Sequence, residues 1–501
     1  MLDYNDLFDY QKRVIAAILA DPKASMLWLD MSMGKTPIVL TALLTLIYQF
    51  RIRRVLVLAP RIVAETVWHK EAAKWRHLEG AKVSILRGKT RDLRLCRTGS
   101  NFHVCNYESI PWLVDAVDRY FLRRGKPPPW DAVVFDEVDR FKNASGVRFQ
   151  DLRRLLAPSG GGTWFPVRIG MTGTPGENGY LDLHGQYLAV DDGARLFEHV
   201  GDFRQQWFST KVADYGATYV LRKGAKEDMQ DRVRDITHSL SADDYLDLPP
   251  VLNEDRWVEL PPKVQAAYDD LESAMWAMID AGDLSAFGMD GDSDADADRA
   301  GDGTASPLEI RAKSAAGART KCRQIANGAL KGLADTDFQA IHDRKLQELD
   351  RVMHEANGRP VLLAYAFRAD MHRIMARYSK EYRCAYIGPG TKDSGAILDG
   401  WTRGDYHLLV SHPASIGHGV DGLQTTCNEM VWFGLTDNLR WYRQFGARIR
   451  RLGQPQSVVH VRHIVARNTV DEAIAALLTL KDVTATELRQ ALSDYRRHKG
   501  A

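Results

Sequence analysis

The stretch that decides the fold is MLWLDMSMGKTPIVLTALLTLIY, residues 26–48. Its first residues, Met26–Leu29, form a short apolar run that predicts a buried strand, and Asp30–Met33 predict a turn. Thr36–Tyr48 carry apolar residues at helical spacing, with Pro37 in the first turn, where its missing N–H costs nothing. This strand–loop–helix order directs backbone N–H groups and the positive end of a helix toward a phosphate. The stretch therefore predicts a phosphate-binding loop.

Two residues of this loop carry its chemistry. Lys35 would reach the terminal phosphates and Thr36 would bind Mg²⁺. The first glycine of the usual phosphate-loop pattern is replaced by Leu29, so the loop taken alone is equally consistent with an ordinary strand–helix turn. A second Gly-Lys-Thr, residues 88–90, follows its strand without a loop, and we assign it to a surface turn.

An acidic pair follows another apolar run. Ala132–Phe135 predicts a buried strand that ends in Asp136 and Glu137. Carboxylates at the carboxyl end of a parallel strand lie in the crevice where open α/β sheets bind ligands. Asp136 would hold Mg²⁺, and Glu137 would orient and deprotonate the attacking water. A solvated acidic loop is the alternative, and the phosphate loop in the same half of the chain disfavours it.

A basic segment near the far end of the chain is the third candidate. Residues 442–454, YRQFGARIRRLGQ, open with helical spacing, so Gln444, Arg448 and Arg451 are predicted to share one helix face. Guanidinium groups so placed could reach a departing γ-phosphate, which is worth about 10³–10⁵ in rate. A basic helix that faces solvent or nucleic-acid phosphates is the alternative interpretation.

Short apolar runs alternate with stretches of helical period along most of the chain. The alternation is typical of parallel sheets covered by helices, and it occurs twice. We therefore expect an α/β fold with lobe 1 at residues 1–245, an interlobe crossover at 246–262 and lobe 2 at 263–501. The predicted strands are Met26–Leu29, Arg54–Leu58, Ala132–Phe135, Arg168–Met171, Val361–Ala366, Cys384–Ile387, His407–Val410, Met430–Phe433 and Val458–Ile464.

Two segments interrupt this alternation. Residues 246–262 carry two Pro-Pro pairs around the alternating run Arg256–Leu260, which predicts a stiff crossover with one edge strand. Residues 283–307 include a run in which Asp alternates with small residues. An EF-hand loop needs Gly at its sixth position and Glu at its twelfth, and neither register of the Asp run provides them. We therefore predict a disordered insertion there and no calcium site.

The composition bounds the class of protein. The 501 residues exceed the size of one hydrophobic core, and 45% of them are hydrophobic, as in ordinary globular proteins. No run approaches the roughly 18 apolar residues that span a bilayer, and the first residues do not have the pattern of a signal peptide. The five scattered cysteines suit a reducing cytoplasm. The net charge of +2 does not exclude nucleic acid, since a basic patch can hide in the average.

Taken in chain order, these segments resemble the motifs of the Swi/Snf type of superfamily-two helicase-like ATPases, which are DEAD/DEAH-box-related DNA translocases, in a compact phage or prophage form. Asp30–Thr36 resembles the phosphate loop of that family, which also lacks the early glycine, and Asp136–Asp139 matches its DEAH-like box. The other matching segments are Tyr10-Gln11, Val57–Pro60 with Val67-Trp68, Asn106–Glu108, Met171–Pro175, Lys321–Gly328, Lys345-Leu346, Ala414–Gln424 and Gln444–Gln454.

Four features depart from the family pattern. Val420–Gln424 stands where the family more often has Leu-Asn-Leu-Gln, with an apparent extra residue, and Phe445-Gly446 replaces a commoner pair of small residues. The Asp-rich insertion and the short basic tail Arg496–Lys499 have no obvious counterpart.

The resemblance implies two RecA-like P-loop domains in tandem, with ATP in the interlobe cleft and Mg²⁺ as the metal. The catalytic residues that it implies are Lys35, Asp136, Glu137, Gln444, Arg448 and Arg451. The nucleotide-binding residues that it implies are Gln11, Met33, Gly34, Lys35, Thr36, Gly419 and Asp421, with Thr36 and Asp136 at the metal. Thr172, Gly173 and Thr174 would couple hydrolysis to nucleic-acid binding, and the candidate contacts to nucleic acid are Arg61, Asn106, Arg368 and His412.

The function that the resemblance implies is ATP-driven movement along double-stranded DNA by a monomer in the cytoplasm, in the bacterial host cell if a phage encodes it, with backbone contacts and no membrane. A helicase that separates strands of DNA or RNA is one alternative. A non-catalytic nucleic-acid-binding protein on a helicase scaffold is another. Trp28, Trp68 and Trp75 could stack on bases, but their spacing within strands and helices favours a place in the core.

Overall fold

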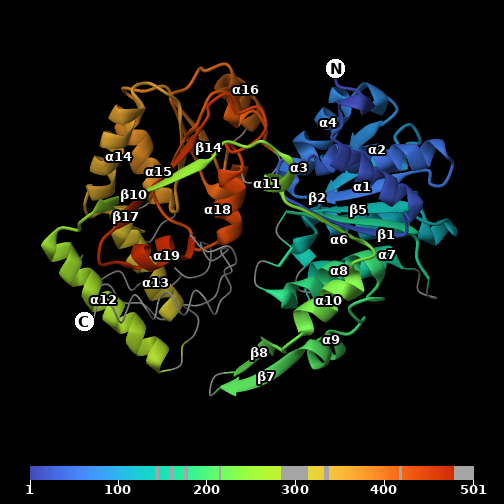
Figure 1. Ribbon diagram of the computed structural model, residues 1–501, viewed down its shortest axis with the longest axis horizontal. Helices are drawn as coiled ribbons and strands as arrows, with labels where there is room; N and C mark the ends of the chain where they lie inside the picture. The colour runs from blue at the N-terminus through green and yellow to red at the C-terminus, as the bar shows by residue number, and fades with distance from the viewer. Residues whose placement is uncertain are drawn as a thin grey trace. The chain divides into compact units, whose positions relative to one another are not determined.

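The computed structural model describes residues 1–141, 146–157, 162–173, 175–176, 179–213, 216–281, 283, 314–331, 338–391, 393–416 and 420–478. The chain divides into two compact units, the first being Met1–Lys211 with Thr218–Asp247 and the second Val212–Ala217 with Leu248–Ala501. Each unit is built around its own parallel sheet with helices packed against it, so the predicted α/β class is confirmed (Figure 1).

Within the described part of the first unit, seven strands form one sheet in the order β3-β4-β2-β5-β6-β1-β9, and the paired strands are parallel. The strands are β1 (Ala24–Leu29), β2 (Val55–Ala59), β3 (Val83–Ile85), β4 (Phe102–Asn106), β5 (Ala132–Asp136), β6 (Val167–Thr172) and β9 (Thr237–Leu240). β2, β5 and β6 are buried at every residue, as expected for a parallel sheet that is covered on both faces.

Helices pack around this first sheet, and a separate two-stranded hairpin follows α9 (Val200–Trp207) in the chain. The helices are α1 (Asp9–Ala20), α2 (Lys35–Tyr48), α3 (Arg61–Thr66), α4 (Trp68–Lys74), α5 (Arg91–Cys96), α6 (Ile110–Tyr120), α7 (Val147–Leu156), α8 (Leu183–Asp191), α9 (Val200–Trp207), α10 (Ala225–Val233) and α11 (Ala242–Tyr245). The hairpin consists of β7 (Phe208–Ala213) and β8 (Gly216–Leu221). α2 is buried along most of its length, because most of its residues are apolar.

The described part of the second unit contains a six-stranded sheet in the order β10-β17-β16-β13-β15-β14, with parallel pairing. Its strands are β10 (Val251–Val258), β13 (Val361–Ala364), β14 (Cys384–Ile387), β15 (Leu408–Ser411), β16 (Glu429–Trp432) and β17 (Val459–Ala466). The surrounding elements are α12 (Pro262–Asp280), α13 (Ala315–Asn327), α14 (Arg344–Ala356), α15 (Arg368–Tyr378), α16 (Ser394–Thr402), α17 (Pro413–Ile416), α18 (Leu439–Gly446), α19 (Val470–Leu478) and the small pair β11 (Ala329–Lys331) and β12 (Phe338–Ala340).

Every strand predicted from the apolar runs is present, within two residues at each end. Three strands of the first sheet were not predicted: β3 is only three residues long, β4 contains His103 and Asn106, and β9 is mostly polar. The alternating run near Arg256 does form an edge strand, since β10 pairs with β17 alone. Residues 284–307 of the Asp-rich insertion and the basic tail Arg496–Lys499 lie outside the described residues.

The core position expected for the three tryptophans is confirmed for two of them. Trp68 and Trp75 are buried, and Trp28 is partly exposed but packs against the core of the first unit. Among the described helices, none has both the length and the apolar character that crossing a bilayer requires.

Candidate nucleotide site

Three sequence motifs meet at the carboxyl ends of the strands of the first sheet. β5, β6 and β1 are neighbours, so their carboxyl ends lie side by side. Asp136, the last residue of β5, is in register with Met171 of β6, and Trp28 of β1 is in register with Thr172. The phosphate loop, the acidic pair and the coupling motif predicted from the sequence are therefore brought together.

The phosphate loop has a backbone that only glycine accommodates at Gly34. Gly34 has φ +71°, and α2 begins at the next residue, Lys35. A Cβ atom on Gly34 would clash with Nε2 of Gln11, closer than any real contact. Ser32 also adopts a positive φ, of +69°. The loop thus turns sharply into the amino end of α2, where free N–H groups favour anions.

Gln11 and Tyr10 hold the phosphate loop from α1. The Nε2 atom of Gln11 donates to the carbonyl of Met33 at 3.1 Å, and the Tyr10 hydroxyl donates to the same carbonyl at 3.0 Å. The Oε1 atom of Gln11 accepts from the backbone N–H of Phe8 at 2.9 Å. Gln11 therefore lies against the loop, and Tyr10, which the sequence named only as the neighbour of Gln11 in a matching segment, holds the same carbonyl.

Lys35 lies over its own loop. Its Nζ atom donates to the carbonyls of Leu29 at 2.7 Å and Asp30 at 3.2 Å. Gly173 lies beside it, since a Cβ on that glycine would be 3.6 Å from the Lys35 Nζ. The Asp30 carboxylate accepts from the backbone N–H of Ala242 at 2.9 Å, which ties the loop to α11. The ammonium group and the coupling motif are thus in contact range of one another.

Asp136 is a buried carboxylate, 6% exposed, at the end of β5. The indole N–H of Trp68 donates to its Oδ2 atom at 3.0 Å, and the Tyr107 hydroxyl donates to its backbone carbonyl at 2.7 Å. Burial, followed by the charge of Glu137, raises the pKa of Asp136 to about 7, while Trp68 and Lys35 act in the opposite direction. Trp68 is therefore more than a core residue: it positions the carboxylate.

Glu137 follows in a conformation that is rare for residues other than glycine, with φ +59°. Such a backbone costs about 1–3 kcal/mol and persists only where its surroundings enforce it, commonly at functional sites. The Thr172 hydroxyl donates to Oε2 of Glu137 at 3.5 Å, a long hydrogen bond. The acidic pair and the coupling motif are thus linked directly.

The donor set fits Mg²⁺ better than a protein-only metal site. No group of three or more His, Cys, Asp or Glu side chains in the described ranges could hold a metal ion. Mg²⁺ usually takes one or two protein oxygens and completes its shell with phosphates and water. Asp136 is a buried carboxylate whose charged form a cation would stabilise, and Thr36 is the second residue of α2. These two residues are the ones that would hold the ion.

The predicted helix of the basic segment is shorter than expected. α18 ends at Gly446, so Arg448 and Arg451 do not extend a helix face from Gln444, and that prediction is wrong. Gly446 is a poor helix former, and the chain tightens after it: the N–H of Ile449 bonds the carbonyl of Gly446 at 3.2 Å. The arginines lie on the turns that follow.

The two arginines nevertheless converge on one peptide carbonyl. Arg448 donates to the carbonyl of Val420 at 2.7 Å, and Arg451 donates to it at 3.3 Å. Arg451 also lies 3.5 Å from the carboxylate of Asp421. The predicted nucleotide-binding segment around Asp421 and the predicted arginines thus form one cluster. Gly419 and, in the first unit, Thr174 lie outside the described residues.

Gln444 lies next to this cluster in sequence and is 1% exposed. Neither its Nε2 nor its Oε1 atom has a hydrogen-bond partner in the described part of the chain. A buried amide without partners costs free energy, and such groups in native proteins call for an explanation.

The four nucleic-acid candidates follow strands that are paired in the sheets. Arg61, the first residue of α3, and Asn106, the last residue of β4, lie at the ends of the neighbouring strands β2 and β4. Arg368 and His412 come after the neighbouring strands β13 and β15. Each pair is thus brought to one sheet edge within its own unit.

Their local contacts differ. Arg61 pairs with Glu65 at 3.1 Å and is 65% exposed. Asn106 donates to Glu108 at 2.8 Å and accepts from Ser109 at 2.6 Å. The ring of His412 contacts the rings of Tyr365 and Trp441, with centroids 5.5 and 5.2 Å away.

Motif residues 321–328 and Lys345 have a structural place in the second unit. Lys345 is fully buried, and its Nζ atom donates to Asp471 at 2.5 Å, Asn327 at 2.8 Å and the carbonyl of Phe433 at 3.2 Å. Asn327 donates in turn to Asp370 at 2.8 Å. This satisfied network joins α13, α14, α15 and α19.

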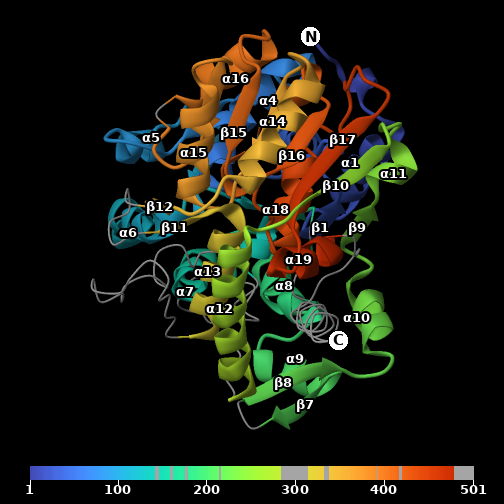
Figure 2. The same cartoon turned by 90° about the vertical axis from the view of Figure 1, so that its left-hand side faces the viewer.

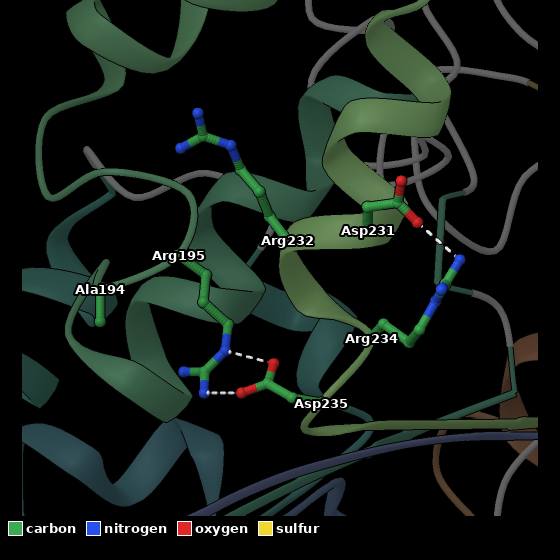
Figure 3. Close-up of a pocket in the computed structure, with 6 residues that line it drawn as sticks. All are labelled: Ala194, Arg195, Asp231, Arg232, Arg234 and Asp235. Carbon is green, nitrogen blue, oxygen red and sulfur yellow. Dashed lines mark hydrogen bonds and ion pairs between the residues drawn. The ribbon is translucent and has the colours of Figure 1, made fainter.

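An open pocket of about 570 Å³ also occurs in the first unit (Figure 3). It is lined by Ala194, Arg195, Asp231, Arg232, Arg234 and Asp235. Arg195 donates to both oxygens of Asp235 at 2.8 and 2.5 Å, and Arg234 donates to Asp231 at 2.6 Å. The pocket lies just before β9, at the amino ends of the strands, and its charges largely neutralise one another. It is distinct from the phosphate loop.

The arrangement of loop, strand-end carboxylates and parallel sheet is that of a P-loop α/β protein. The family model for SNF2-related domains matches residues 10–291. Protein p41 of Acyrthosiphon pisum secondary endosymbiont phage 1 is 31% identical over 478 residues, which cover 93% of this chain and 94% of p41. The chain therefore belongs to the SNF2-related family, and the resemblance to Swi/Snf-type ATPases is confirmed.

Among solved structures, the Sulfolobus solfataricus SWI2/SNF2 ATPase core in complex with dsDNA is similar over 98% of this chain and 96% of that chain. The TM-score is 0.41 and the sequence identity is 18%.

Proposed function

We propose that the protein hydrolyses ATP and uses the hydrolysis to move along double-stranded DNA. The observation that carries this proposal is the convergence of Lys35, the Asp136-Glu137 pair and Thr172 at three neighbouring strand ends in a member of the SNF2-related family. A decayed, non-catalytic scaffold would have no reason to keep the buried carboxylate of Asp136 or the strained backbone of Glu137, since both cost stability.

The chain's own groups divide the work at the phosphates. Lys35 exchanges its bonds to the loop carbonyls for phosphate oxygens, and the N–H groups at the start of α2 bind beside it. Asp136 and Thr36 would hold Mg²⁺, which would offset negative charge on the phosphates. Glu137 orients the attacking water and accepts its proton. Gln11, Met33 and Gly34 bind the nucleotide through the loop that they shape.

The second unit has its own cluster of cationic groups. We assign Arg448 and Arg451 to stabilising charge on the γ-phosphate, and Gln444, Gly419 and Asp421 to the same nucleotide-contacting segment. The convergence of both arginines on the carbonyl of Val420 supports this assignment, because the bonds hold the two guanidinium groups together before any nucleotide binds.

We infer that the residues at the strand ends contact DNA, namely Arg61, Asn106, Arg368 and His412. Cationic and amide groups of this kind bind phosphates and sugar, so binding is expected to be salt-sensitive and nearly independent of sequence. Thr172, Gly173 and Thr174 would transmit the state of the nucleotide, and the bond from Thr172 to Glu137 supports that role.

The proposal is tested by the steady-state rate of ATP hydrolysis by the full chain. Lys35→Ala is expected to lower the rate at least about 10²-fold by removing phosphate contacts, and Glu137→Gln to do so by removing the base. Lys23→Ala is the matched control: Lys23 is exposed and precedes β1, whereas Lys35 follows it. Its rate should equal that of the natural protein. Full activity in Lys35→Ala and Glu137→Gln would contradict the proposed site.

A further inference from the structure

A strongly basic surface lies on the first unit, apart from the motif residues. Residues 87–126 hold nine Lys or Arg and four Asp or Glu, a net charge of +5, although the whole chain carries only +2. The cationic residues of this surface, which we call the basic edge, are Arg87, Lys89, Arg91, Arg94, Arg97, Arg119, Arg123, Arg124 and Lys126. They belong to α5, α6, the turn Leu122–Arg124 and the adjoining loops, beside the edge strand β3.

The two helices of the basic edge are fixed to each other. The carboxylate of Asp92 on α5 accepts from the indole of Trp112 at 3.0 Å and from the hydroxyl of Tyr120 at 2.9 Å, both on α6. Figure 2 shows the ribbons of these two helices. The guanidinium of Arg91 lies 4.3 Å from the ring of Trp112. One of the four carboxylates is thus used to dock α5 on α6, and the cations of both helices share one surface.

Most of these cations are left without a counter-charge. Arg87, Arg91 and Arg123 have carboxylate partners. The other six form no ion pair with any described residue: Lys89, Arg94, Arg97, Arg119, Arg124 and Lys126. All six are exposed. Exposed cations at this density repel one another, which costs stability, and a polyanion would relieve the cost.

The basic edge is continuous with a candidate DNA contact. Glu65 on α3 pairs with Arg61 at 3.1 Å and also with Arg87. Arg61 follows β2 at the sheet edge to which the nucleic-acid candidates of this unit belong. A row of cations therefore runs from that edge through Arg87 to α5 and α6. Evenly spaced phosphates of a duplex are the polyanion that fits an extended row.

We propose that the basic edge is a second contact surface for the phosphate backbone of duplex DNA, which extends the track that begins at Arg61. This proposal rests on the proposed function, because it assumes that the protein binds DNA. It adds that a set of cations outside the family motifs supplies part of the affinity. Since these cations contact phosphates, they contribute salt-dependent affinity and no sequence preference.

The test is a triple variant, Arg97→Ala with Arg124→Ala and Lys126→Ala, measured for binding to a labelled duplex DNA over a series of salt concentrations. None of the three side chains forms a hydrogen bond or ion pair with a described residue, and Arg124 contacts the ring of Tyr120 only at 6.0 Å, so the fold should be retained. The logarithm of the binding constant falls as the logarithm of the salt concentration rises, and each phosphate contact contributes about 0.9 to the steepness of that fall. Losing three contacts should therefore make the dependence shallower by up to about 3. ATP hydrolysis without DNA should be unchanged.

The control removes the same charge from elsewhere on the first unit: Lys23→Ala with Arg222→Ala and Lys223→Ala, all three exposed and outside the basic edge. An unchanged salt slope in the first variant would overturn the inference, and so would an equal decrease in both variants, which would indicate a general effect of net charge. If the natural protein binds no duplex at all, the proposed function fails together with the inference. If the natural protein binds duplex DNA and the triple variant binds it equally well, only the inference about the basic edge is contradicted, and the proposed function stands.

Discussion

At the scale of single residues, Asp136 carries the most information about the site. It is buried at a strand end, accepts a hydrogen bond from Trp68 and has a pKa raised to about 7, chiefly by burial. Because this pKa exceeds the value of 3.8 for a free carboxyl, the folded state binds more protons than the unfolded state between those pH values. Stability should therefore fall as pH rises through this range.

The variant Asp136→Asn tests whether the Asp136 carboxyl makes the protein less stable as pH rises. The amide keeps an acceptor for Trp68 but carries no charge, so it removes the pH-dependent penalty. Without Mg²⁺, the variant should gain stability over the natural protein as pH rises from about 5 to about 8, on the order of 2 kcal/mol at about 1.4 kcal/mol per pKa unit. Thermal unfolding at both pH values measures the gain. A variant whose advantage is the same at both would contradict the raised pKa. ATP hydrolysis should be abolished at either pH.

At the scale of elements, the sequence predicts the three strands that lead into the phosphate loop, the acidic pair and the coupling motif, because buried parallel strands are continuous apolar runs. It does not predict β4, in which His103 and Cys105 are buried among apolar residues. The sequence also did not predict that α18 ends at Gly446. Residue spacing alone cannot distinguish a continuous helix from a shorter helix that is followed by turns.

Contacts between distant elements were beyond the sequence for a different reason. Trp68 reaches Asp136 across 68 residues, and Tyr10 reaches Met33 across 23. No local pattern marks such a pair, since the two residues meet only after the sheet has formed. The sequence therefore named Tyr10 and Trp68 only as parts of matching segments, and their contacts with the Met33 carbonyl and with Asp136 appear only in the structure.

The turn from loop into α2 gives a prediction at this scale. Gly34→Ala should abolish tight nucleotide binding, because the added Cβ clashes with Gln11 and φ +71° is unfavourable for alanine. Gly88→Ala is the matched control, because Gly88 also has a positive φ, of +73°, but no described atom lies within 4 Å of its added Cβ, so it carries the same backbone cost of about 1–2 kcal/mol and should leave nucleotide affinity unchanged. Binding of a fluorescent ATP analogue measures both. Wild-type affinity in the single variant would contradict the loop conformation.

At the scale of the whole molecule, two α/β units each contribute one cluster of candidate residues. The first holds the loop and the carboxylates, and the second holds the paired arginines around Val420. The near-neutral charge of the chain conceals an uneven distribution, with +5 concentrated in residues 87–126. Family membership, the candidate nucleotide site and this charge distribution all support the proposed function.

The proposed function is tested most directly by the rate of ATP hydrolysis measured without nucleic acid and with duplex DNA, single-stranded DNA or RNA, on the natural protein and Glu137→Gln in parallel. We expect duplex DNA to raise the rate most, by at least about tenfold, with the rise weakened by salt and absent in Glu137→Gln. A rate that no nucleic acid changes, or one that single strands or RNA raise more than duplex DNA, would contradict the proposed function.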